Sequence, residues 1–248
     1  MRMSNWKTYT LGELAEINPK ISLKQGSEYS FFEMKDLDAT LKYGSPSVKK
    51  ELKGGSKFQN GDTLFARITP CLENGKICQV KNLENEVGFG STEFMIFRGK
   101  EDLSDTDFIY YITRTEYVRN AAIQAMTGTS GRQRVEKSAL QELDVVAPDL
   151  KSQKSIASIL SSLDNKIELS LQMNQTLEEM AQAIFKEWFV NFNFLSREPK
   201  GAYLGRSPDV GNIKEKSVPI AIGIIVIGSN EICNPDLLID KSLSKEDL

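Results

Sequence analysis

The feature that most constrains the fold is a stretch from residue 150 to 192 that contains neither proline nor glycine. Apolar or small residues recur in this stretch at alternating intervals of four and three. The positions are Ile156, Leu160, Leu163, Ile167, Ser170, Asn174, Leu177, Ala181, Ile184 and Trp188. A stripe sustained over more than four heptads predicts one long α-helix, roughly 65 Å in length at 1.5 Å per residue.

Such a helix cannot bury its stripe against itself. The rest of the sequence offers no second stretch of heptads, so we expect the partner helix to come from another molecule. Asn174 at an a position and Ser170 at the preceding d position interrupt the apolar stripe. A buried asparagine at position a often fixes the register and the oligomeric state. The alternative is that both residues face solvent in a looser bundle, and the sequence leaves both possibilities open.

The first 149 residues are predicted to form one mixed α/β domain that is rich in short strands. Strand character is found at 29–32, 63–66, 77–80, 94–97 and 143–147. Turn signals lie at 60–62, 74–76 and 88–90. The predicted fold class is therefore mixed α/β, with a β-rich globular domain at 1–149 followed by one long helix at 150–193.

One helix is expected inside this domain, after Ser104 or Asp105, either of which could cap it. The glycine-rich segment 127–131 would end it. The residues expected to face the core are Phe108, Ile109, Ile112 and Val118.

Residues 194–248 form a third segment, predicted to be a tail or an incomplete second unit. Prolines and glycines break up its start, at Pro199, Gly201, Gly205, Pro208 and Gly211. The longest apolar run of the chain, 218–227, contains Pro219 and Gly223. Because a spanning helix needs about 20 apolar residues, no transmembrane segment is expected.

Composition excludes several classes of chemistry. The chain has no histidine, which excludes histidine-based triads, histidine metal ligands and a histidine general base. Its three cysteines, Cys71, Cys78 and Cys233, form no C-x-x-C pair, so no zinc site is expected. So few cysteines, with no recognisable secretion signal, favour a reducing cytoplasm. The net charge of −3 means that any nucleic-acid binding must use a local patch.

Motifs for cofactors and catalysis are also missing. Neither Gly75-Lys76 nor Gly99-Lys100 sits in a phosphate-binding loop, and Gly88-Phe89-Gly90 lacks the third glycine of a dinucleotide turn. Asp149, Asp164 and Lys166 loosely match the pattern of metal-dependent nucleases. The two carboxylates would lie about 20 Å apart along the helix, however, so they could not share a metal ion. We therefore predict no catalytic residues, no metal and no cofactor, and interpret Asp149 as an N-cap or an acidic residue of the helix's first turn.

Polar and basic loops are the candidate binding residues. Arginine and glutamine suit paired contacts to base edges, and glycine-rich loops can approach phosphates closely. The candidates are Arg67, Thr69, Lys76, Ser91, Thr92, Thr129, Ser130, Arg132, Gln133 and Arg134. A basic run at Lys49, Lys50, Lys53 and Lys57 lies nearby in sequence. The alternative is that these are ordinary solvated turns, which composition alone favours.

Several segments together resemble the specificity subunit of type I restriction-modification systems. The segments 6–14 (WKTYTLGEL) and 60–67 (NGDTLFAR) are similar to parts of that family's target recognition domain. The segment 128–135 with Leu140, Leu143 and Pro148 is similar to the exit from that domain. The strongest similarity is to the family's conserved helix, carried by Gln153, Ile156, Ala157, Ile159, Leu160, Leu163, Asp164, Ile167 and Glu168 and continuing to Phe189. The resemblance covers residues 6 to about 192.

The resemblance implies a subunit without bond chemistry of its own, which reads double-stranded DNA and docks methyltransferase subunits, joined by a motor-nuclease subunit. Family members have two recognition domains and two long antiparallel helices, so this chain is similar to one half. It implies a target recognition domain at 1–149 and, at 150–193, a helix for dimerisation, spacing and docking. Two copies would pair their helices antiparallel and read two inverted half-sites. The open alternatives are a nuclease or methyltransferase acting alone, and a coiled-coil adaptor whose head binds protein.

Overall fold

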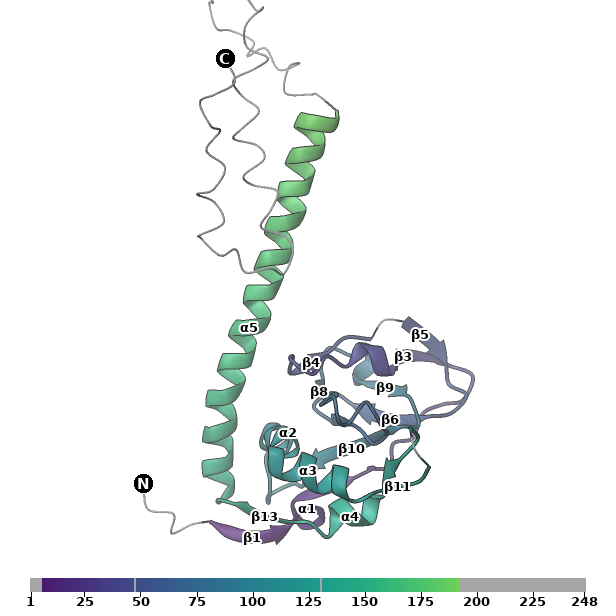
Figure 1. The fold of residues 1–248 in the computed structure, drawn as a ribbon, viewed down its shortest axis with the longest axis vertical. Coiled ribbons are helices and arrows are strands. Elements are labelled where there is room, and N and C mark those ends of the chain that lie inside the picture. The colour runs from purple at the N-terminus through teal and green to yellow at the C-terminus, as the bar shows by residue number, and fades with distance from the viewer. Residues whose placement is uncertain (1–5, 47, 130, 192–248) are drawn as a thin grey trace, which may run out of the picture. The chain divides into compact units, whose positions relative to one another are not determined.

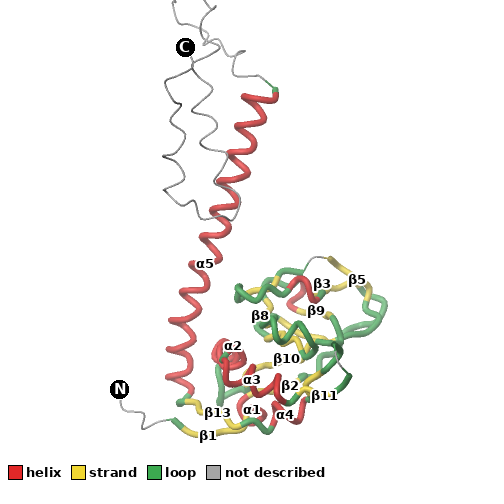
Figure 2. The backbone as a smooth tube through the Cα atoms, in the orientation of Figure 1, coloured by secondary structure: helices red, strands yellow, loops and turns green. Residues whose placement is uncertain are grey.

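The computed structural model describes residues 6–46, 48–129 and 131–191. The chain divides into a first unit that ends at Ser170 and a second that begins at Leu171. The first unit contains sheets and short helices and the start of a long helix, as Figures 1 and 2 show. The fold is mixed α/β, as predicted. The predicted tail at 194–248 and the candidate residue Ser130 lie outside the described residues.

Two sheets make up most of the first unit. Within the described ranges, the larger has the strand order β2 (Ala15–Ile17), β10 (Phe94–Gly99), β7 (Thr63–Ala66), β8 (Ile77–Val80), β4 (Tyr43–Gly44). The smaller has the order β5 (Val48–Glu51), β3 (Glu28–Phe32), β9 (Val87–Gly90), β6 (Ser56–Gln59). Neighbours are antiparallel except for β3–β9 and β4–β8. All the strands that the sequence predicted are present.

Two strand pairs close the unit. β1 (Lys7–Thr10) pairs with β13 (Asp144–Ala147), directly before the long helix. β11 (Met126–Thr127) pairs with β12 (Arg134–Val135) and forms a small hairpin. The two ends of the segment 7–147 are therefore paired with each other as antiparallel strands.

The prediction of a turn at 88–90 was wrong, because these residues form β9, an inner strand of the smaller sheet. Its glycines serve close packing. A Cβ on Gly88 would lie 2.9 Å from the carbonyl oxygen of Ser30, and one on Gly90 would lie 2.8 Å from that of Phe32. Glycine in a strand often marks such a close approach of backbones.

The single helix predicted after Ser104 or Asp105 is two helices, α2 (Thr106–Arg114) and α3 (Glu116–Gln124). Asp105 caps α2 by accepting a hydrogen bond from the amide of Phe108. Thr115 has extended backbone angles, and its hydroxyl accepts from the amide of Val118, which starts a new helix. The four predicted core residues, Phe108, Ile109, Ile112 and Val118, are all buried.

The larger sheet separates two apolar cores. Along β10, Met95 and Phe97 face a core that also contains α1 (Leu11–Leu14), α2, α3 and α4 (Lys137–Gln141). Phe94 and Ile96 face a second core shared with the smaller sheet. Because both faces of the sheet are covered, β7, β8 and most of β10 are buried at successive positions. Short 3₁₀ turns at Met34–Asp36 and Glu84–Glu86 complete the unit.

The long helix α5 runs from Leu150 to Phe185 and continues as a π-helical turn at Lys186–Val190. Asp149 accepts a hydrogen bond from the amide of Ser152 at 2.9 Å, which confirms it as a cap. The predicted stripe extends to Trp188, but Trp188 lies in the π turn, where the helical phase changes. Among the residues that the structure describes, no helix combines the length and apolar character that a membrane crossing requires.

The start of α5 is attached to the first unit by polar contacts. Gln153 is buried, donates to the carbonyl of Pro148 at 2.9 Å, and accepts from the amide of Asp105. Ala157 packs in the first core, and Ile156 packs against the same core. The first member of the predicted dimer seam, Ile156, is therefore half-buried against the chain's own domain.

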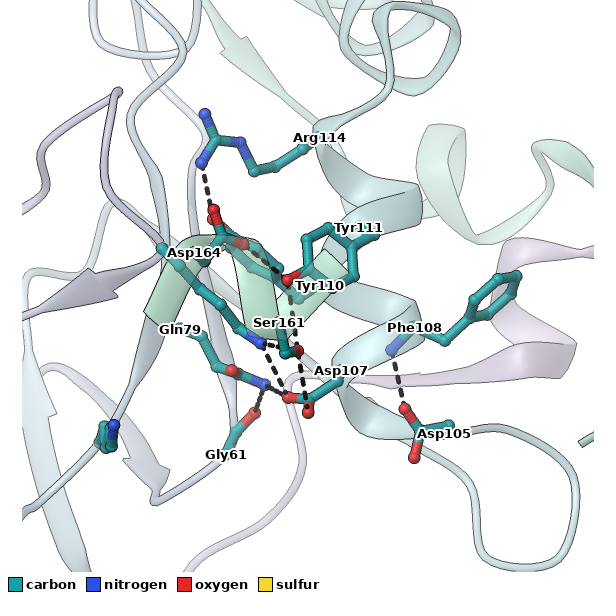
Figure 3. A network of polar contacts seen from close by, with 12 residues as sticks. Gly61, Gln79, Asp105, Asp107, Phe108, Tyr110, Tyr111, Arg114, Ser161 and Asp164 are labelled. Atoms are coloured by element: carbon teal, nitrogen blue, oxygen red, sulfur yellow. Dashed lines mark hydrogen bonds and ion pairs between the residues drawn. The ribbon is translucent and has the colours of Figure 1, made fainter. Parts of the chain in front are cut away.

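A buried lysine lies at the centre of this attachment. The Lys42 side chain is 1% exposed, and its Nζ donates to Ser161 Oγ at 2.7 Å and lies 3.3 Å from Asp107 Oδ1. The Tyr111 hydroxyl donates to Asp164 Oδ2 at 2.6 Å. Figure 3 shows Ser161 and Asp164 of α5 pointing toward Asp107 and Tyr111 of α2. Burial lowers the pKa of the Lys42 ammonium, against the opposing attraction of Asp107.

We expect Lys42→Met to lower the free energy of unfolding by about 1–3 kcal/mol, because it removes the ammonium that donates to the buried Ser161 hydroxyl and pairs with Asp107. Urea unfolding at one fixed protein concentration measures this. Lys81→Met is the matched control, since Lys81 is 43% exposed and lies 3.9 Å from Glu168. It should cost about 1 kcal/mol or less, and equal losses for the two variants would contradict the role of Lys42.

Candidate nucleic-acid interface

Three of the predicted polar loops meet in the structure. We call residues 67–69, 91–93 and 128–135 the loop cluster. The amide of Arg67 donates to the carbonyl of Glu93 at 3.0 Å, and the amide of Val135 donates to the carbonyl of Arg67 at 2.9 Å. Thr69 and Gln133 exchange backbone and side-chain hydrogen bonds. In Figure 1, the β11 hairpin lies on the side of the first unit away from the first turns of α5.

The loop between β11 and β12 presents the most exposed candidates. Thr129 and Arg132 are exposed, and Gln133 is half-buried. The amide of Arg132 donates to the carbonyl of Thr129 at 3.0 Å, which closes the turn. Gly128 and Gly131 have φ values of 125° and 78°, which favour glycine. The turn therefore holds Thr129 and Arg132 at the tip of a hairpin whose base is fixed.

Arg134 holds the cluster together. Its Nε lies 2.9 Å and 3.0 Å from the two carboxylate oxygens of Glu93, and its Nη2 donates to Glu93 Oε1 at 2.7 Å. This contact ties 91–93 to the hairpin. Thr69 is buried, and its hydroxyl accepts from the amide of Gln133 at 3.1 Å. Arg134 and Thr69, both predicted as binding residues, thus use these side chains inside the cluster.

Glu93 is the residue that sequence reasoning missed. It is separated from Arg134 by 41 positions, and no local pattern marks the pair. The hydrogen bonds from Arg134 hold the pKa of the Glu93 carboxyl below its ordinary value of 4.5. The sequence contains one weak sign of this role. Glu93 is an acidic residue directly after Ser91 and Thr92, two candidates for binding DNA, where a basic residue would be expected.

Arg67 lies in the middle of the cluster with few side-chain partners. Its Nη2 is 3.7 Å from Glu136 Oε1, and its buried Nε has no hydrogen-bond partner among the described residues. The Arg67 side chain as a whole is 25% exposed. Because backbone bonds fix Arg67 on both sides, its side chain is held at the surface with donors to spare.

Lys76 is not brought into the cluster. Its Nζ donates to the carbonyl of Met34 at 2.8 Å. Ser91 and Thr92 do belong to the cluster, and the Ser91 hydroxyl accepts from the amide of Glu93 at 3.2 Å. Thr92 is exposed.

A shallow surface hollow of about 530 Å³ adjoins Ser91 and Thr92. Lys50 and Lys53 line it together with Phe31 and Glu33. Lys50 Nζ donates to Glu33 Oε1 at 2.7 Å and lies 4.0 Å from the centre of the Phe31 ring. Lys35 and Lys50 together lower the pKa of Glu33 to about 2. Lys49 pairs with Glu84 at 2.5 Å, so half of the predicted basic run is neutralised by carboxylates.

The Glu93–Arg134 pair predicts an acid-sensitive contribution to stability. Because the folded-state pKa of Glu93 is lowered, its contribution is complete above about pH 4.5 and is lost as the pH falls through the lowered pKa. We expect Glu93→Gln to lower the urea midpoint at about pH 7, and the difference from the parent chain to shrink as the pH is lowered below about 4.5 and the Glu93 carboxyl takes up a proton. Glu116→Gln, at an exposed position of α3, is the control. A deficit that does not change as the pH is lowered would contradict the ion pair.

The sequence and the fold of this chain both match known proteins. The chain matches the family described as "Type I restriction modification DNA specificity domain" over residues 3–179. The HindI specificity subunit of Haemophilus influenzae is 33% identical over 200 residues, which are 77% of this chain and 42% of that protein. The EcoAI specificity subunit of Escherichia coli is 30% identical over 186 residues, or 70% of this chain and 32% of that protein.

A solved structure shares the fold. The crystal structure of the HsdS subunit from Thermoanaerobacter tengcongensis superposes with a TM-score of 0.52 at 18% identity, covering 82% of this chain and 52% of that one. The chain thus spans about half or less of the length of these relatives. Because the family match covers well over half of the chain, the chain belongs to the type I restriction-modification DNA specificity family.

Proposed function

We propose that this chain is a DNA-reading specificity subunit that has no catalytic activity of its own. The observation that carries the proposal is the convergence of three polar loops, separated in sequence, into one loop cluster with exposed Arg132, Thr129 and Thr92. In this proposal residues 1–149 read one half of a split DNA site. The helical segment 150–193 serves dimerisation, spacing and the docking of methyltransferase subunits, and residues 194–248 remain a tail or incomplete unit.

The loop cluster supports a division of roles among its side chains. Arg132, Gln133 and Arg67 retain free donors and are proposed to contact base edges or phosphates. Thr92 and Thr129 are proposed to contact the backbone of the DNA. Arg134, Thr69 and Ser91 are proposed to act through the shape of the cluster, since their side chains hold it together. Lys76, and Ser130, which lies outside the described residues, stay candidates on sequence grounds only.

The family suggests partner subunits for this chain, and the exposed apolar row on α5 suggests a second copy of the chain. We propose assembly with methyltransferase subunits and a motor-nuclease subunit, which would supply the chemistry on double-stranded DNA. We also propose an antiparallel homodimer through α5, because Leu163, Ile167, Leu177 and Ile184 are 48–59% exposed. Exposed apolar side chains in such a row are typical of a partner surface. Cys71 and Cys78 are free thiols, in keeping with the proposed cytoplasmic location.

We expect Arg132→Ala and Arg67→Ala to weaken DNA binding by the assembled complex with methyltransferase subunits. If the arginine reads a base, its replacement should weaken binding to the cognate site by about 1–3 kcal/mol and relax the sequence preference at one base position. A residue that holds a phosphate should weaken binding to all sequences and flatten the salt dependence. Lys151→Ala, at an exposed position in the first turn of α5, is the control. Unchanged binding over a salt series would remove that arginine from the interface.

Homodimerisation predicts the form of the recognised site. We expect the purified chain to have the mass of a dimer by light scattering. Methylome sequencing of cells that carry the chain with its methyltransferase should then give a split palindrome, because two identical reading domains are related by a two-fold axis. An asymmetric motif would contradict the dimer. A chain that pairs but binds no DNA in the complex would support the adaptor hypothesis instead.

A further inference from the structure

One face of α5 packs on the chain's own first unit, and a neighbouring apolar face is exposed. Gln153, Ala157 and Ser161 are buried by the chain's own first unit, at 1%, 2% and 8% exposure. Leu163 and Ile167 are 56% and 50% exposed. With about 100° between successive residues, the two stripes lie about 120° apart around the helix. The domain therefore leaves the apolar seam open while it occupies a neighbouring face.

The structure also fixes where this open seam begins and ends. Ile156 and Leu160 are both half-buried, but only Ile156 packs against the first core, so we take Leu160 as the first seam residue that remains available. The α-helix ends at Phe185, and the π turn moves Trp188 out of phase. The last seam residue in phase is therefore Ile184. The level midway between Leu160 and Ile184 is residue 172.

The polar seam positions point to the same level. In an antiparallel coiled coil, a residue at position a faces a residue at position d of the other helix. A two-fold axis at residue 172 places Asn174 opposite the partner's Ser170. In the next layer out from the axis, Ile167 lies opposite the partner's Leu177. Leu163 follows opposite the partner's Ala181, and Leu160 lies outermost, opposite the partner's Ile184. Every apolar residue then faces an apolar one.

Neighbouring registers lack this match. A shift of one heptad places Asn174 opposite the partner's Leu177 or the partner's Leu163. The asparagine amide would then be buried against a side chain that offers no hydrogen bond, which is unfavourable. The Ser170 hydroxyl donates to the carbonyl of Lys166 at 2.8 Å, so opposite the partner's Asn174 its oxygen still accepts a hydrogen bond from the amide NH2 group.

We infer that α5 pairs with a second copy of this chain around a two-fold axis at residue 172, with Asn174 bonded to the partner's Ser170 in the two central layers. The inference rests on the proposed homodimer and adds its register. The ends of the free seam and its polar positions are separate observations, and both give the same centre.

This register sets the spacing of the two domains along the paired helices. Ser161, which bonds to Lys42, lies eleven residues before the axis. At 1.5 Å per residue, the two Ser161 anchors would lie about 33 Å apart along the helix.

Spin labels at three outward-facing positions of α5 test the register. Asn165, Gln172 and Glu179 are exposed, occupy position f and are seven residues apart. Each is replaced by cysteine in the full chain with Cys71 and Cys233 changed to serine, leaving Cys78, which is fully buried. Pulsed dipolar spectroscopy then measures the distance between the two labels of each dimer.

The expected result is a shortest distance at position 172 and two equal, longer distances at 165 and 179, each with an axial offset of about 21 Å. Equal distances at two neighbouring positions would show a register shifted by one heptad. Three equal distances would show parallel helices. Either pattern overturns the register while leaving the dimer intact, whereas a monomeric mass overturns the proposed homodimer itself.

A double variant tests whether the polar positions choose the register. Ser170→Leu with Asn174→Leu should keep the dimer and broaden the distance distribution at position 172, because shifted registers no longer bury an unpaired amide. Gln175→Leu with Gln182→Leu, at exposed positions outside the seam, is the control and should leave one narrow distance. A single narrow distance in the Ser170/Asn174 variant would overturn the role of the polar layer.

Discussion

The attachment of α5 depends on a charge that is removed from water. The Lys42 side chain is almost wholly buried, yet it lies among tyrosine rings, a carboxylate and a serine hydroxyl that compensate for its lost hydration. A buried ammonium without these groups would be strongly unfavourable. Because the hydroxyl belongs to α5 and the carboxylate to α2, satisfying the lysine requires both helices to be in place. One polar requirement thus fixes where the helix leaves the domain.

A second ion pair organises the loop cluster at the other side of the domain. Glu93 and Arg134 form a two-pronged contact that joins a tight turn to the β11 hairpin. Contacts of this geometry are directional as well as strong. The cluster can therefore hold exposed side chains such as Arg132 in a defined place, although its own backbone is made of short loops.

Sequence patterns predicted the elements that depend on local order. The strands around Thr63, Ile77 and Phe94 were found because apolar runs bounded by turn residues are a local signal. The long helix was found because its period repeats many times. The break at Thr115 was missed because a capping hydroxyl can also be tolerated inside a helix.

Long-range pairing could not be predicted in the same way. The turn assigned to 88–90 was wrong because glycine marks both turns and crowded strands, and only the neighbouring backbones distinguish the two. Lys42 and Ser161 are 119 positions apart, and Glu93 and Arg134 are 41 apart. Each partner looks like an ordinary polar surface residue in the sequence. Ile156 likewise fits the heptad stripe, and only the tertiary structure shows that it packs against the core of the domain.

The loop cluster and the helix attachment share no side chain. Lys42, Asp107, Tyr111, Ser161 and Asp164 form one set, and the residues of the three loops form another. Substitutions in the loops are therefore free to accumulate without loosening the helix, as long as the Glu93–Arg134 contact survives. A chain built in this way can change what it contacts through a few surface positions while the attachment of its long helix stays the same.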